Sequence, residues 1–99
     1  MTKIPEIKKT LDDIKKLTVN SSNPKIKRYI EMFEEITDKT HIKSIIELKK
    51  NLELERKSIS TTLKDNFPLF IKYDNIYREM ISAAEFIIFI LKKRKKGVI

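Results

Sequence analysis

Side chains that commonly carry catalysis are scarce in this chain of 99 residues. It contains no cysteine, a single histidine (His41) and a single glycine (Gly97). These counts exclude a cysteine–histidine pair, an HExxH zinc site and a multi-histidine metal site. They also exclude the glycine-rich turns that bind phosphates or dinucleotides. We therefore expect no metal and no cofactor.

Carboxylates remain as candidates for acid–base chemistry, and they gather in two stretches. One contains Glu31, Glu34, Glu35 and Asp38, and the other contains Glu53 and Glu55. Acid–base catalysis requires two carboxyl groups in one pocket with separated pKa values, and no pattern here marks a pocket. The spacing favours a solvated helix face that makes ion pairs. The sequence predicts a protein that is not an enzyme.

Positive charge is the strongest compositional feature. Lysine and arginine number 22 against 14 acidic residues, which gives a net charge of +8. The basic residues that we predict to contact nucleic acid form a continuous run near the C-terminus and a smaller group near residue 26: Lys92, Lys93, Arg94, Lys95 and Lys96, with Lys25, Lys27 and Arg28. Such side chains neutralise phosphates, although lysine-rich segments are also attracted to anionic membranes.

The elements that position these residues are predicted to be helices. The chain has the length of one domain, and its many Lys, Glu, Ile and Leu residues favour helix. Each of its three prolines, Pro5, Pro24 and Pro68, precedes an apolar repeat of helical spacing and so indicates a helix start. We predict four helices, at about 5–18, 24–36, 40–64 and 68–95.

These helices predict an all-α fold: a small antiparallel bundle with two short and two long helices and a flexible basic C-terminal tail. The domain would cover residues 1–91 and the tail residues 92–99. Asn23 is the expected N-cap of the second helix, and Asp38 or Thr40 that of the third. With 36% charged residues and no Gln, Cys or Trp, the composition resembles that of thermophile proteins.

Two basic residues interrupt the apolar stripe of the third helix. Lys49 and Arg56 share that stripe with Leu52. Their long side chains can extend to the edge of the helix interface. The alternative is a buried ion pair, in which Arg56 would meet Glu79 or Glu35.

The last predicted helix contains six consecutive apolar residues, FIIFIL, directly before the basic run. Because a helix turns about 100° per residue, Phe86, Phe89 and Ile90 point away from the stripe that contains Ile87. The apolar segment 80–91 is shorter than the ~20 residues that span a bilayer, so we expect no transmembrane segment. Three interpretations of this segment stay open: burial inside the bundle, docking on a partner, and contact with a membrane surface. We predict that Phe86, Phe89 and Ile90 bind a partner.

Three functions fit this pattern. The first is a non-catalytic accessory or adaptor subunit that docks on a larger protein, or on itself, in a DNA- or RNA-processing complex, with the basic tail on nucleic acid. The second is a helix-turn-helix DNA-binding regulator, with His41, Lys43 and Ser44 facing bases. The third is a membrane-surface or immunity-type helical bundle. Because the N-terminus lacks an apolar secretory signal, we expect a cytoplasmic protein. We also expect no small-molecule substrate.

Overall fold

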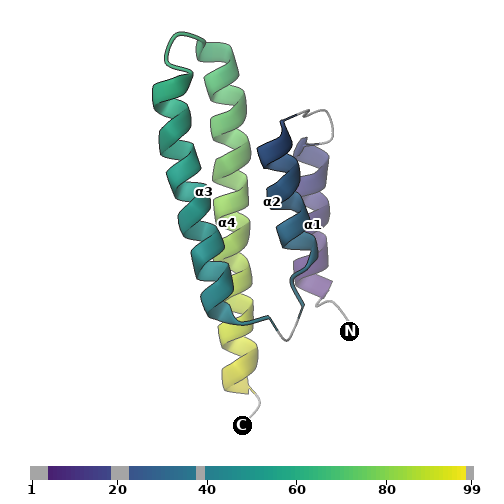
Figure 1. Cartoon of the computed structure of the whole chain (residues 1–99). Helices are drawn as coiled ribbons and strands as arrows, with labels where there is room; N and C mark the ends of the chain where they lie inside the picture. Colours follow the sequence, from purple (N-terminus) through teal and green to yellow (C-terminus); the bar gives the residue numbers. More distant parts are fainter. Residues whose placement is uncertain (1–4, 19–22, 38–39, 98–99) are drawn as a thin grey trace. The chain divides into compact units, whose positions relative to one another are not determined.

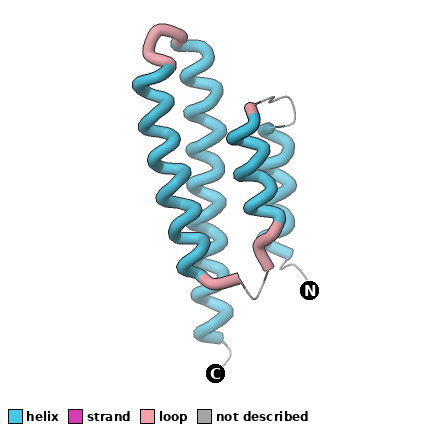
Figure 2. The backbone as a smooth tube through the Cα atoms, viewed as in Figure 1, coloured by secondary structure: helices cyan, strands magenta, loops and turns pink. Residues whose placement is uncertain are grey.

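The computed structural model describes residues 5–18, 23–37 and 40–97. These residues form four helices and no strand: α1 (Pro5–Thr18), α2 (Pro24–Glu34), α3 (Ile42–Thr62) and α4 (Phe67–Gly97) (Figure 1). Figure 2 distinguishes these helices from the described loop residues, among them those that join α3 to α4. The predicted all-α class, with two short and two long helices, is confirmed.

The chain divides into two units, Met1–His41 and Ile42–Ile99. In the first unit, α1 and α2 lie side by side and run antiparallel (Figure 1). An ion pair joins them, with 3.0 Å between Lys15 Nζ and Glu34 Oε1. The buried side chains of the two helices are apolar and follow helical spacing: Ile7, Leu11, Ile14, Ile26 and Phe33.

The second unit is an antiparallel pair of the two long helices (Figure 1). Between α3 and α4 the chain reverses through residues 63–66, where the Asn66 N–H donates to the Leu63 carbonyl at 3.0 Å. The buried residues of α3 are Ile45, Leu48 and Leu52. Those of α4 lie on the predicted stripe and beside it: Ile76, Tyr77, Met80, Ala83, Ala84, Ile87 and Leu91.

Asparagine side chains mark the starts of two helices. Asn23 precedes α2, and its side chain accepts a hydrogen bond from the Lys25 N–H at 2.9 Å, which confirms the predicted cap. α4 starts at Phe67, one residue before the predicted start. The Asn66 side chain accepts from the Leu69 N–H at 3.3 Å, and this bond satisfies a backbone donor that the helix itself leaves unpaired.

The segment between α2 and α3 differs from the prediction in length. α2 ends at Glu34 and α3 begins at Ile42, so seven residues, 35–41, separate them. The hydroxyl of Thr40, one of the two predicted caps of α3, accepts from the Thr37 N–H at 2.9 Å and so bonds to the preceding segment instead of to the helix. Asp38, the other predicted cap, lies outside the described residues. A helix-turn-helix motif has a turn of about 3–4 residues, so this spacing gives the DNA-regulator hypothesis no support.

α4 continues through the basic run to Gly97. The side chains of Lys92 and Lys93 are exposed, whereas those of Arg94, Lys95 and Lys96 lie outside the described part. The boundary at residue 91 and the flexibility of segment 92–99 therefore stay predictions. Within the described ranges, no helix combines the length and apolar content that crossing a bilayer requires.

Candidate interaction surface

The C-terminal half of α4 carries exposed aromatic side chains beside buried aliphatic ones. Phe86 is 41% exposed and Phe89 is 60% exposed, whereas Ile87 between them is 1% exposed. Ile90 is half-buried. The predicted orientation of both phenylalanines, away from the stripe of Ile87, is thus confirmed. We refer to Phe86, Phe89 and Ile90 as the aromatic patch.

Helical geometry explains how the aromatic patch and the basic residues come together. Phe86, Phe89 and Lys93 follow a spacing of three and four residues, so they share one side of α4. Lys92 is exposed one residue earlier. The patch therefore combines a large apolar contact area with positive charge at its edge.

A second pair of exposed apolar side chains stands at the other end of α4. Phe67 is 66% exposed and Ile71 is 41% exposed. The Phe67 ring stacks on Phe70, with 6.4 Å between ring centroids. The sequence analysis did not predict this pair. Its i, i+4 spacing, on a side of the helix other than the apolar stripe, could have indicated it.

Within the described ranges, the remaining exposed large apolar residues stand alone on other helices. They are Met32 on α2, and Ile46 and Leu54 on α3. Single exposed apolar side chains are common on protein surfaces and need no binding partner. They serve here as reference positions for the experiments below.

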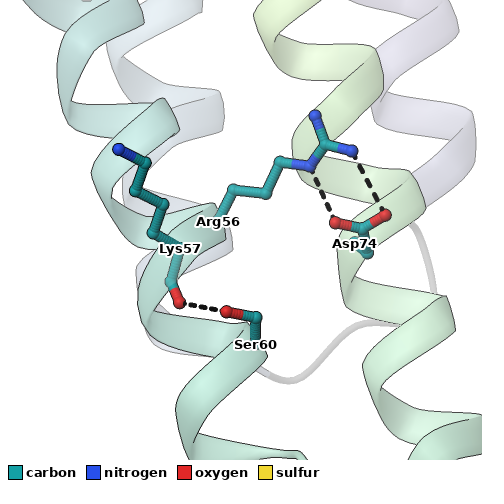
Figure 3. Close-up of polar contacts among 4 residues, drawn as sticks. All are labelled: Arg56, Lys57, Ser60 and Asp74. Carbon is teal, nitrogen blue, oxygen red and sulfur yellow. Dashed lines mark hydrogen bonds and ion pairs between the residues drawn. The ribbon is translucent and has the colours of Figure 1, made fainter.

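Among the described side chains, two ion pairs join α3 to α4. Arg56 Nε donates to Asp74 Oδ1 at 2.7 Å, and Nη2 donates to Oδ2 at 3.4 Å (Figure 3). The second pair places Lys49 Nζ 3.3 Å from Glu85 Oε1. The predicted edge position of both basic residues is confirmed, since the Arg56 side chain is 39% exposed and that of Lys49 is 31% exposed.

The predicted partners of Arg56 were wrong. The antiparallel register about residues 63–66 brings position 56 level with position 74, while Glu79 lies about 7.5 Å further along α4. Glu35 belongs to the first unit. Asp74, at the edge of α4 that faces α3, is therefore the carboxylate within reach.

The Arg56–Asp74 pair contributes modestly to the stability of the fold. The hydrogen bond to Asp74 raises the pKa of Arg56 above its ordinary value, assisted by charge attraction and opposed by desolvation. Because folding raises the pKa of Arg56, the pair contributes its full stabilisation at pH values below the pKa of the unfolded state. The stabilisation is lost as the pH rises through the pKa of the folded state, so it persists at neutral and mildly alkaline pH. A partly exposed pair of this kind is worth about 0.2–1 kcal/mol.

A shallow groove of about 450 Å³ surrounds this pair. Its lining residues come from α3 and α4: Glu53, Arg56, Lys57, Ser60, Asp74, Ile81 and Glu85. The Ser60 hydroxyl donates to the Lys57 carbonyl at 2.6 Å (Figure 3). Arg56 and Asp74 bond to each other, and Glu85 pairs with Lys49. The two ion pairs bridge α3 and α4, and they engage two of the three carboxyl groups in the lining of the groove.

The other candidate residues lie on solvated surfaces. His41, Lys43 and Ser44 are exposed, as are Lys25, Lys27 and Arg28 on the first turns of α2. The α2 basic group and Lys92 with Lys93 belong to different units. Among the described residues, no group of three or more His, Cys, Asp or Glu side chains is arranged to hold a metal ion.

Comparison with known proteins assigns no relatives. The chain matches no protein-family model, no curated protein and no solved structure.

Proposed function

We propose that this protein is a non-catalytic helical binding module that docks on a partner protein through the aromatic patch. The single observation that carries this proposal is the exposure of Phe86 and Phe89 in a helix whose adjacent residue Ile87 is buried. The three side chains come from one apolar segment. Both rings remain partly exposed to solvent, although the same helix has a buried face.

The energetics favour an occupant for the aromatic patch. Fully burying a phenylalanine is worth about 1.5–3 kcal/mol, and large rigid aromatic side chains are enriched among the residues that dominate binding energy. Protein interfaces typically combine such an apolar centre with a polar rim. Lys92 and Lys93 are exposed beside the patch and provide part of that rim.

Binding measurements with a paired substitution test the docking role. The partner recovered with the tagged wild-type chain from its host would be purified and titrated with wild type and with Phe86→Ser plus Phe89→Ser. Losing about 3 kcal/mol of apolar burial weakens binding roughly a hundredfold. Leu54→Ser is the matched control, because Leu54 is 64% exposed on α3 and lies outside the patch. Equal affinity of all three proteins would contradict the proposal.

The basic end of α4 supplies the second part of the proposed function, contact with nucleic acid. If Lys92, Lys93, Arg94, Lys95 and Lys96 each neutralise one phosphate of duplex DNA, the logarithm of the binding constant falls against the logarithm of salt concentration with a slope of about −4.5. Fluorescence anisotropy with labelled duplexes measures this slope. A slope that does not change when residues 92–99 are removed would exclude the basic end from the contact.

A further inference from the structure

The side of α4 that is turned away from its buried stripe carries apolar residues at both ends and polar residues between them. Ile71 and Phe89 are separated by 18 residues, which is five turns at 3.6 residues per turn, so they face the same direction. Phe67 stands beside the first, and Phe86 beside the second. On this side of the helix, the exposed residues between the two ends are polar: Asn75, Arg78, Ser82 and Glu85.

This arrangement is self-complementary under a twofold rotation. We propose that a second copy of this chain is the partner, and that it packs antiparallel along α4 with the twofold axis at the level of residue 80. Each Ile71 then lies opposite Phe89 of the other copy, so all four apolar ends are covered at once. This inference rests on the proposed function and names the partner that occupies the aromatic patch.

Charge supports the antiparallel direction. A parallel pair would bring Lys92 and Lys93 of both copies together, and like charges at close range are unfavourable. The antiparallel pair separates these basic ends. It also places Arg78 opposite Ser82 of the other copy, one helical turn from its Glu85, and the symmetry produces this opposite-charge contact twice.

The size of the face sets the strength of the dimer. Residues 67–93 span about 39 Å of helix, and one helix face of this length is smaller than the ~800 Å² per partner of standard interfaces. We expect dissociation in the micromolar range. Since both copies carry a net charge of +8, added salt screens their repulsion and strengthens the dimer.

Sedimentation equilibrium of the purified chain tests the proposal. The wild type is expected to dimerise, more tightly at higher salt. Ile71→Ser and Phe89→Ser should each weaken the dimer about a hundredfold, because the symmetry removes two side chains with each substitution. Leu54→Ser is the control and should leave it unchanged. Circular dichroism of each variant confirms that the helices are retained.

Single cysteines test the direction, because the native chain has none. In the proposed dimer, the two copies of position 82 are offset by about 6 Å along the helix axis, whereas the two copies of position 93 are offset by about 39 Å. Ser82→Cys should form disulfide-linked dimers on oxidation, and Lys93→Cys should not. Rapid linkage at position 93 would indicate a parallel pair and overturn the proposal.

The remaining outcomes separate this inference from the proposed function. A dimer that requires Phe89 but not Ile71 overturns the antiparallel arrangement and leaves the aromatic patch as a docking surface. A monomer at every salt concentration overturns the dimer. If that monomer binds another protein, or anionic vesicles, only while Phe86 and Phe89 are present, a different molecule occupies the patch.

Discussion

Leu52→Ala is expected to lower the free energy of unfolding by about 2–5 kcal/mol, the range for removing a fully buried leucine side chain. Leu52 has 0% exposure and lies in the middle of α3. The substitution loses the transfer free energy of the missing methyl groups and leaves a cavity on the buried side of α3. Since small domains often have only several kcal/mol of stability, this change is large enough to unfold much of the population.

Leu54 provides a control of the same residue type on the same helix. It is 64% exposed, and Leu54→Ala should change stability by about 0.5 kcal/mol or less. Urea unfolding followed by circular dichroism measures both variants. Leu52→Val, expected to cost less, gives a measurable value if the alanine variant is unfolded. Equal losses for Leu52→Ala and Leu54→Ala would contradict the helix orientation.

The second large effect is expected at Ile87. This residue is 1% exposed, so Ile87→Ala should cost about 2–5 kcal/mol of unfolding free energy. Phe89, two residues later, is 60% exposed, and Phe89→Ala should cost about 1 kcal/mol or less although it removes a larger side chain. The order of these losses is therefore opposite to the order of side-chain size.

This contrast matters for function because it separates folding from docking. If Phe89→Ala leaves the fold intact, loss of partner binding by Phe89 variants reports on the interface and not on unfolding. Thermal unfolding of the two variants gives the comparison. A loss at Phe89 as large as that at Ile87 would show that the ring supports the fold.

Local chemistry made the helices predictable. Proline fixes a backbone angle suited to a first helical turn, and α1, α2 and α4 start at or within one residue of Pro5, Pro24 and Pro68. The helical spacing of apolar residues likewise predicted most of the buried residues of α4, although Ile76 and Ala83 are buried beside the predicted stripe. Both signals act over a few residues, so the sequence displays them directly.

Contacts between helices were harder to predict. The partner of Arg56 depends on the register that residues 63–66 impose, and sequence spacing on one helix does not reveal which carboxylate of another helix lies level with it. Exposure of Phe67 and Ile71 also depends on which sides of α4 its neighbours cover. The candidate interaction surface was therefore only half predicted: the aromatic patch was identified, and the opposite end of the same helix face was not.

The most direct test of the docking surface is the reactivity of a single introduced cysteine in host cells. Ile90→Cys keeps both phenylalanine rings, and Ile46→Cys, on exposed α3 surface, is the reference. Each rate of alkylation would be measured in host cells and in dilute purified protein. A bound partner slows alkylation by a factor of one plus the partner concentration divided by Kd. We therefore expect alkylation in cells to be at least about tenfold slower at position 90 and unchanged at position 46. Equal reactivity of position 90 in cells and in dilute solution would show that nothing covers the aromatic patch.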